Sequence, residues 1–353
     1  MPANIQYAWP HPSRKYFYIV SSNGGPGVAG DKHYANAFRI DPASGALTPH
    51  GSPQALPSRP IHTSVDHAGQ YLLIAYNDPS SVTVHRLDAD GTIGGPVSQP
   101  GKLDTGIYAH QIRAIPSNQM VILVARGNNA EPGKPEDPGA IKTFGFKNGI
   151  LTGLASIQPG NGLGFGPRHL DFHPTQPWVF VSIERQNKLY VYERDVQTGL
   201  ARAPMFVKDT LADPSPKVRQ AAGAIHVHPS GKFVYLTNRA SDLVDLNGTK
   251  AFTGGENNVA VFAIDQTSGE PTLIQNADGQ AIELRTFGIE PSGRMLVAAS
   301  IKPVPVRDAG GIKTVPAKLC VFHIGSDGKL ELKRQYDVDT GAHQQFWSGM
   351  VTL

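Results

Sequence analysis

Several side chains that could bind an anion or move a proton fall at two recurring points of a repeated strand pattern in this sequence. At the end of the second predicted strand of successive repeats stand Ser22, Asn77, Arg126, Glu184, Arg239 and Ile301. At the entry of the first predicted strand stand Gln6, Ile61, His110, Arg168, Gly223 and Arg285. In an antiparallel hairpin these two points lie at the same edge of the sheet, so we expect both sets to surround one mouth of a central channel.

The third to fifth repeats place three arginines, one histidine and one carboxylate at this mouth, namely Arg126, Arg168, Arg239, His110 and Glu184. Arginines that share a site repel one another unless a carboxylate or a bound anion offsets their charge. The pattern therefore favours an anionic ligand. A histidine or carboxylate can also take a proton from water while a guanidinium stabilises a developing oxyanion. For Arg168 and Glu184 alone, a structural cross-strand ion pair worth about 0.5 kcal/mol is the alternative interpretation.

An internal repeat positions these points. Six segments share a turn between two apolar strands, and they begin at His11, Asp66, Ile115, His173, His228 and Glu290. Their turns lie about 50 to 60 residues apart, which is typical of four-stranded propeller blades. In the fourth repeat the pattern predicts strands at residues 168–172, 178–183 and 188–193, with a fourth strand after Gly199. No segment has a sustained helical period, so we expect very little helix.

The predicted fold class is an all-β, seven-bladed β-propeller that forms a single domain over residues 1–353. Residues 344–351 follow the sixth repeat and are predicted to be the inner strand of a seventh blade. The other strands of that blade would have to precede the first inner strand, predicted at residues 4–9, and they are missing. We therefore expect an incomplete closing blade, with a six-bladed ring as the alternative.

Three connections between second and third strands are unusually long, at residues 127–139, 240–256 and 302–316. Such connections leave from the same edge as the mouth of the channel. Long irregular segments in a compact domain are often functional, so we expect these three to wall a pocket there.

Composition narrows the class of partner. Hydrophobic residues make up 40% and charged residues 17% of the chain, which is enough apolar material for a substantial core. The net charge of +3, without a basic stripe, argues against nucleic acid as a partner. No leader-like or membrane-length apolar run occurs, so we expect a cytoplasmic protein with no membrane partner. The single cysteine, Cys320, lies in an apolar run and is predicted to be a core residue.

The remaining histidines and acidic residues show no metal-ligand spacing, and no G-x-S-x-G nucleophile motif occurs. His62 and His169 stand one residue deeper in their strands, where a hydrogen-bonded interior histidine is favoured over a catalytic one. His173 and His228 fall at the opposite turn and are predicted to be structural. We expect chemistry that needs neither a metal nor a cofactor.

Several short motifs resemble those of the 6-phosphogluconolactonase-type propeller lactonase family, which includes carboxymuconate-lactonizing relatives. They are GPRHLDFHP at residues 166–174, VSIE at 181–184, AIHV at 224–227, TNR at 237–239 and NNVAVF at 257–262. The resemblance implies a seven-bladed propeller and a site with one histidine, one glutamate and two arginines. Matched motif by motif, the expected catalytic residues are His110, Arg168, Glu184 and Arg239. Ile183 departs from the asparagine that family members usually have before this glutamate.

The expected function is hydrolysis of an anionic sugar or aldonic lactone by a base-activated water. His110 or Glu184 would be the base, Arg168 would polarise the carbonyl, and Arg239 with Arg126 would hold a phosphate or carboxylate. The further expected substrate contacts are Arg126, His169, Asn77 and Arg285. A lactonizing cycloisomerase acting on an unsaturated dicarboxylate and a non-catalytic propeller that binds a small ligand are the alternatives.

Overall fold

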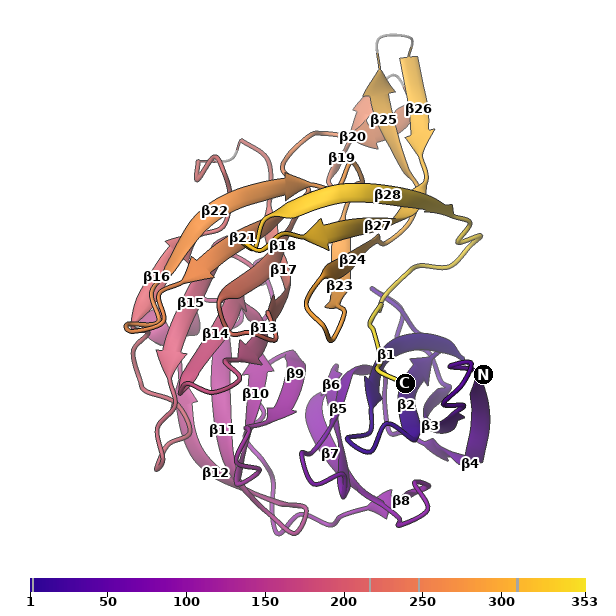
Figure 1. Cartoon of the computed structure of the whole chain (residues 1–353), viewed down its shortest axis with the longest axis vertical. Coiled ribbons are helices and arrows are strands. Elements are labelled where there is room, and N and C mark those ends of the chain that lie inside the picture. Colours follow the sequence, from indigo (N-terminus) through magenta and orange to yellow (C-terminus); the bar gives the residue numbers. More distant parts are fainter. Residues whose placement is uncertain (2, 216, 247, 309–310) are drawn as a thin grey trace. The chain divides into compact units, whose positions relative to one another are not determined.

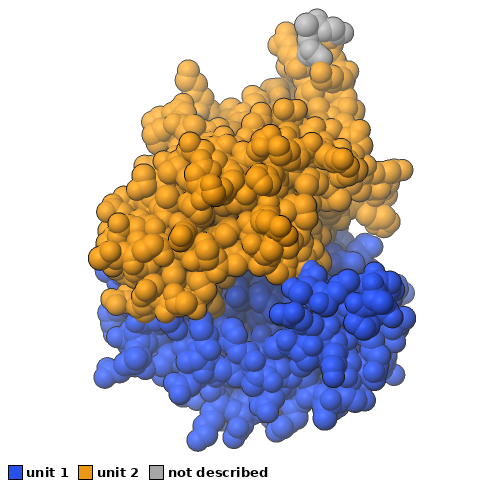
Figure 2. Space-filling view, in the orientation of Figure 1, with its two compact units in different colours: residues 1–168, 194–203, 351–353 blue, residues 169–193, 204–350 orange. Residues whose placement is uncertain are grey.

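The computed structural model describes residues 1, 3–215, 217–246, 248–308 and 311–353. These residues hold six four-stranded antiparallel sheets and two two-stranded sheets (Figure 1). The chain divides into two compact units (Figure 2). Unit 1 comprises residues 1–168, 194–203 and 351–353, and unit 2 comprises residues 169–193 and 204–350. The single domain expected over residues 1–353 stays a prediction.

Unit 1 contains three of the four-stranded sheets. The first has the strands β1 (Asn4–Pro10), β2 (Tyr16–Ser22), β3 (His33–Ile40) and β4 (Leu47–Ala55). The second has β5 (Pro60–Val65), β6 (Tyr71–Asn77), β7 (Ser80–Leu87) and β8 (Ile93–Pro96). The third has β9 (Ala109–Ala114), β10 (Met120–Ala125), β11 (Ala140–Lys147) and β12 (Ile150–Ile157). In each sheet the strands lie side by side in chain order, as expected of a propeller blade.

Unit 2 carries the other three, although the first two residues of β13 belong to unit 1. The fourth sheet has β13 (Pro167–Phe172), β14 (Trp178–Ile183), β15 (Lys188–Glu193) and β16 (Phe206–Asp209). The fifth has β17 (Ala221–Val227), β18 (Phe233–Arg239), β21 (Asn258–Ile264) and β22 (Pro271–Asp278). The sixth has β23 (Leu284–Ile289), β24 (Met295–Ser300), β27 (Ala317–Ile324) and β28 (Leu330–Val338). The strands expected in the fourth repeat are thereby confirmed.

Helix is nearly absent, as predicted: the part of the chain that the structure describes contains one short 3-10 helix, η1 (Pro159–Gly162), and no α-helix. Two of the long connections form hairpins instead of irregular loops. They are β19 (Leu243–Leu246) with β20 (Thr249–Phe252), and β25 (Val304–Asp308) with β26 (Gly311–Val315). Both hairpins belong to unit 2, where β20 contacts β25 (Figure 1).

Apolar side chains between neighbouring sheets form the cores. The second strands are buried along nearly their whole length, as in β10 (MVILVA) and β14 (WVFVSI). In unit 1 the core joins the second and third sheets through residues such as Leu73 and Leu123. In unit 2, Phe180 and Phe262 belong to one such cluster and Phe287 to another. This packing makes each sheet a rigid platform for the side chains at its strand ends.

A recurring hydrogen bond explains why the repeated turn contains histidine and glycine. The histidine of one turn bonds through Nε2 to the glycine carbonyl of the next sheet's turn, in three pairs that each lie within one unit. The pairs are His11 with Gly69 (2.9 Å), His173 with Gly231 (3.0 Å) and His228 with Gly293 (2.8 Å). A Cβ on any of these glycines would lie 2.4 to 2.5 Å from the histidine Nε2, so only glycine leaves room for the bond. The structural role predicted for His173 and His228 is confirmed.

The seventh inner strand expected at residues 344–351 is not formed. This segment is extended alongside β23, but it joins it through side chains: Ser348 N donates to Thr286 Oγ1 and Thr286 Oγ1 donates to Ser348 O, both at 3.3 Å. A strand needs a ladder of backbone bonds at alternating residues. The described residues therefore form six four-stranded sheets, which is the alternative that the sequence left open.

Candidate functional site

A β-bulge lies at the entry of the first strand in the first, second, third, fifth and sixth sheets. The pairings of first and second strands skip Gln6, Ile61, His110 and Arg285, and in the fifth sheet they skip Gly223 with Ala224. These are the entry positions singled out by the sequence pattern. A bulge interrupts the alternation of side chains and re-aims the extra residue, and bulges are frequent beside active sites. Strict alternation along a strand does not predict such bulges.

His110 is the bulged residue of β9 and only 3% exposed. Its imidazole stacks with the ring of Tyr108, with centroids 6.1 Å apart and planes inclined by 21°. Arg126 follows β10 directly, and its guanidinium carbon lies 3.9 Å from the centroid of the same tyrosine ring. Two residues expected from the sequence are therefore brought together in unit 1 by a third that was not expected.

A second polar group of unit 1 lies at the strand ends of the first sheet. The Arg59 Nε donates to Gln6 Oε1 at 2.9 Å, and both residues are buried. Burial lowers the pKa of Arg59, and the nearby Tyr108 phenol acts in the opposite direction. The Ser22 hydroxyl bonds to His33 Nδ1 at 2.8 Å. Desolvation lowers the pKa of His33, so its neutral form is favoured.

In unit 2, Glu184 follows β14 directly and Arg239 ends β18. The Arg239 Nη2 lies 3.3 Å from Glu184 Oε2, and each residue is 7% exposed. Burial makes this pair different from the exposed ion pairs of the protein, because interactions within the protein must replace those that water would supply. A carboxylate and a guanidinium held in this way can act as a base and an anion-binding group.

The fifth sheet makes room for Arg239 by having glycine at the bulge. A Cβ on Gly223 would lie 2.2 Å from Thr237 Oγ1 and 3.3 Å from Arg239 Cδ. Thr237 Oγ1 accepts a bond from Ala224 N at 3.1 Å, so its place is fixed by the bulged backbone. The Gly223 carbonyl accepts a bond from Ser182 Oγ at 2.8 Å, which ties the fifth sheet to β14.

The other predicted residues are placed as follows. Arg168 is the second residue of β13, the offset that His110 has in β9, and it is 4% exposed. His169 is buried beside it, and its backbone nitrogen donates to Ser182 Oγ at 3.2 Å. Asn77 ends β6 and is half-buried. The Arg285 guanidinium lies 5.0 Å from the centroid of the Phe346 ring, so the C-terminal segment covers this arginine.

Two residues set aside as structural are in the interior. The His62 ring packs on Tyr7 and Trp9, with centroids 4.1 and 5.9 Å away. Cys320 is buried and bonds to Gly279 O at 3.2 Å, and burial raises the pKa of its thiol to about 11. The core position predicted for Cys320 is confirmed, and a thiol in this setting is a poor nucleophile at neutral pH.

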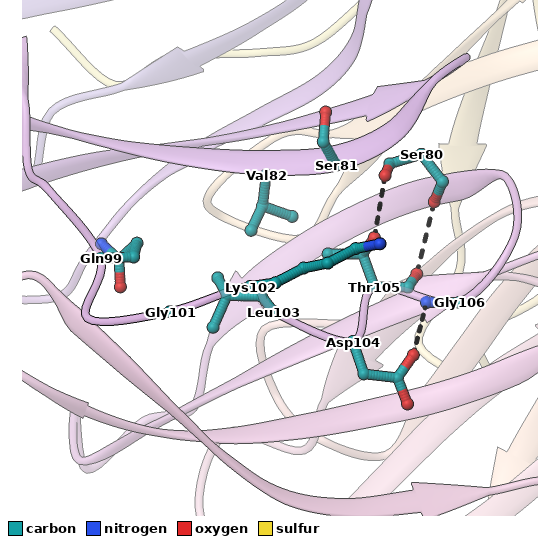
Figure 3. Close-up of a pocket in the computed structure, with 10 residues that line it drawn as sticks. All are labelled: Ser80, Ser81, Val82, Gln99, Gly101, Lys102, Leu103, Asp104, Thr105 and Gly106. Atoms are coloured by element: carbon teal, nitrogen blue, oxygen red, sulfur yellow. Dashed lines mark hydrogen bonds between the residues drawn. The ribbon is translucent and has the colours of Figure 1, made fainter.

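A pocket of about 640 Å³ opens in unit 1 beside β7. Ser80, Ser81 and Val82 line one side, and residues of the segment 99–106 line the other. Figure 3 shows Ser80 and Thr105 joined across it by hydrogen bonds: Thr105 Oγ1 donates to Ser80 O at 3.0 Å, and Ser80 Oγ donates to Thr105 O at 3.4 Å. The ten lining residues include none of the site residues predicted from the sequence.

Among the residues described, no group of three or more histidine, cysteine, aspartate or glutamate side chains is placed to hold a metal ion. The described residues also include no helix that is long and apolar enough to cross a bilayer.

Sequence reasoning missed Tyr108 and Arg59. Tyr108 precedes His110 by two residues, the spacing at which side chains share a face of a strand, so this signal was available. Arg59 lies in the connection before β5, outside the aligned strand positions, and nothing in the repeat pointed to it.

Two proteins with known names are similar in sequence to this chain over most of its length. The chain is 28% identical over 296 residues to the 6-phosphogluconolactonase of Bacillus subtilis (strain 168), covering 80% of this chain and 73% of that one. It is 27% identical over 354 residues to the 6-phosphogluconolactonase of Pectobacterium carotovorum subsp. carotovorum (strain PC1), covering 100% and 90%.

Solved structures share the fold. A periplasmic gluconolactonase of Pseudomonas aeruginosa superposes with a TM-score of 0.72 at 21% identity, covering 96% of this chain and 87% of that chain. A protein from Lactobacillus plantarum superposes with a TM-score of 0.68 at 21% identity, covering 94% and 84%. Residues 2–302 match the family described as lactonase, 7-bladed beta-propeller. This match spans most of the sequence, and the chain therefore belongs to the lactonase family of β-propellers.

Proposed function

We propose that this protein hydrolyses a sugar lactone that carries an anionic group. The observation that carries the proposal is the buried ion pair of Glu184 and Arg239 at the ends of two neighbouring second strands. A buried charge pair is costly to maintain and is often neutral or unfavourable for stability compared with apolar residues. Its presence in a member of a lactonase family is explained if the carboxylate and the guanidinium act on a substrate.

Hydrolysis needs a base for the attacking water and a donor for the oxygen of the carbonyl. The water oxygen bonds to the carbonyl carbon, its proton passes to the base, and the ring C–O bond breaks with the proton returned to the leaving oxygen. Glu184 or His110 is the proposed base, and Arg168 is the proposed donor to the oxyanion. These roles follow from residue type and from the equivalent strand-end positions of the side chains.

The anionic group of the substrate is assigned to Arg239 and Arg126, with His169, Asn77 and Arg285 as further proposed contacts. A guanidinium offers parallel N–H groups that match two oxygens of a phosphate or carboxylate. Two relatives are 6-phosphogluconolactonases, whose name specifies a phosphorylated sugar lactone. A phosphorylated sugar lactone is therefore the first substrate to test.

The experiment is a rate assay on the purified chain with 6-phosphogluconolactone and gluconolactone, corrected for spontaneous opening of each ring. We expect hydrolysis of both, with a higher kcat/KM for the phosphorylated lactone and unchanged rates after dialysis against a chelator. Rates no faster than the spontaneous reaction would overturn the proposal. Formation of a lactone from an unsaturated dicarboxylate would assign the cycloisomerase instead, and tight product binding without turnover would assign a binding protein.

A cytoplasmic location stays a prediction.

A further inference from the structure

Tyr108 has a backbone conformation that tyrosine rarely adopts. Its φ is 60°, in the left-handed region where the Cβ of an L-residue crowds the following carbonyl oxygen. For a bulky residue this is an outlier that costs free energy. Such residues persist where the surrounding structure over-determines them, and they gather at functional sites.

Hydrogen bonds hold this conformation from both sides. Tyr108 O accepts from Arg126 N at 2.9 Å, and Ile107 O accepts from Gly127 N at 2.8 Å. The next residue, Ala109, donates from its backbone nitrogen to Ser80 Oγ at 3.0 Å. The chain enters this segment through Gly106, where a Cβ would lie 2.8 Å from Ala125 Cβ. The segment is therefore fastened to the end of β10, directly beside Arg126.

The conformation gives the Tyr108 ring two polar neighbours. Its face lies under the Arg126 guanidinium, and it stacks with the His110 imidazole. A guanidinium that stacks on an aromatic face is oriented as a plane, so its N–H groups point outward along its edge. The same ring restricts the imidazole, a candidate base, to one inclination.

We propose that Tyr108 is a positioning residue that orients Arg126 towards the anionic group of the substrate and His110 towards the reacting water. The inference rests on the proposed function for the identity of the reaction. The strained backbone is what brings the ring between the strand ends of the third sheet, and any anion with two or more oxygens, phosphate included, is the class of ligand that Arg126 would take.

Three substitutions separate the effect of the aromatic ring from the effect of the strained backbone. Tyr108→Leu keeps the apolar volume and the strained backbone but removes the aromatic face. Tyr108→Gly removes both the ring and the strain, since glycine adopts positive φ readily. Tyr108→Phe keeps the ring and removes only the hydroxyl. The matched control is Tyr16→Leu, because Tyr16 also stacks with a histidine, His50, and carries Arg39 over its ring.

We expect Tyr108→Leu and Tyr108→Gly to raise the KM for the phosphorylated lactone about tenfold and to lower kcat several-fold, the scale of a desolvated cation–π contact. Tyr108→Phe should keep KM and kcat close to the values of the parent. Tyr108→Gly should melt at no lower temperature than Tyr108→Leu, because glycine releases the backbone strain. Tyr16→Leu should alter the melting temperature and leave both constants unchanged. Unaltered KM and kcat in Tyr108→Leu, or equal losses in Tyr16→Leu, would overturn the inference.

Binding of inorganic phosphate, measured by titration calorimetry, keeps this test independent of turnover. If the parent opens no lactone but binds phosphate, and Tyr108→Leu weakens that binding about tenfold while Tyr16→Leu does not, the proposed function fails and the role of Tyr108 stands. If phosphate binds equally to parent and Tyr108→Leu, the role of Tyr108 fails whatever the parent hydrolyses. A parent that neither binds phosphate nor opens a lactone overturns both.

Discussion

Removing the Arg239 guanidinium should leave the Glu184 carboxylate charged in a place that solvent barely reaches. The two groups lie 3.3 Å apart and each residue is 7% exposed. At an effective dielectric constant of about 20 their attraction amounts to about 5 kcal/mol, and loss of one partner from a buried pair typically costs about 3 to 5 kcal/mol. We therefore expect Arg239→Met to lower the free energy of unfolding by about 3 kcal/mol, and Glu184→Gln to have an effect of the same sign.

The double variant Glu184→Gln with Arg239→Met separates stability from catalysis. It removes both charges, and buried pairs replaced together by neutral groups are often close to neutral in stability. We expect the double variant to regain most of the lost free energy of unfolding but none of the activity, with kcat at least about a hundredfold below the parent, as in Glu184→Gln alone. Because Arg239 contacts Glu184, Arg239→Met should lower kcat as well as raise KM, instead of raising KM alone.

Urea denaturation followed by fluorescence measures the free energy of unfolding, and the rate of lactone hydrolysis measures kcat. Asp209→Asn is the control, since Lys188 and Asp209 form a partly exposed salt bridge of 2.6 Å that should contribute little to stability or turnover. The reasoning would be refuted if the double variant regained turnover together with stability. In that case the pair would be a structural ion pair and the base would have to be sought elsewhere.

Three further predictions test the supporting structure. Gly223→Ala should lower kcat and stability together, because its Cβ would collide with Thr237 Oγ1 and press on Arg239 Cδ; unchanged kinetics would show that the bulge adapts. Deleting residues 344–353 should cause aggregation during expression, because it uncovers the edge of β23; a soluble variant with the parent's melting temperature would contradict this. Burial lowers the pKa of His173. As pH falls through 6.5 the unfolded chain therefore binds a proton that the native state does not, and stability is lost. His173→Asn should show a smaller loss of stability between about pH 7.5 and 5.5, and an equal loss would refute the role of His173 in this pH dependence.

The repeat, the strands and the strand-end positions could be predicted from sequence because they depend on local patterns. Apolar alternation and turn residues are set within a few positions of the chain, and their recurrence located the strands of the fourth repeat and the entry points His110 and Arg168. The absence of helical periodicity likewise predicted a chain almost without helix.

Contacts between repeats depended on tertiary structure. The sequence could align Glu184 and Arg239 at equivalent points, but only the packing of neighbouring sheets decided that the two side chains meet. The bulges were also hidden, since one extra residue in a strand leaves the local apolar pattern almost unchanged. The conformation of Tyr108 was hidden too, because its strained φ is held by hydrogen bonds of this segment to Arg126, Gly127 and Ser80, which lie 18 to 28 residues from Tyr108 in the sequence.

The C-terminal segment also differs between what the sequence predicted and what the folded structure contains. Its composition resembles that of an inner strand, yet in the structure the Thr286 hydroxyl bonds to its backbone where a ladder of backbone bonds was expected. The sequence by itself determined which residues stand at the strand ends, because that depends on local period and turn chemistry. The tertiary structure decided which of those side chains meet and in what orientation, because distance and burial are properties of the folded packing.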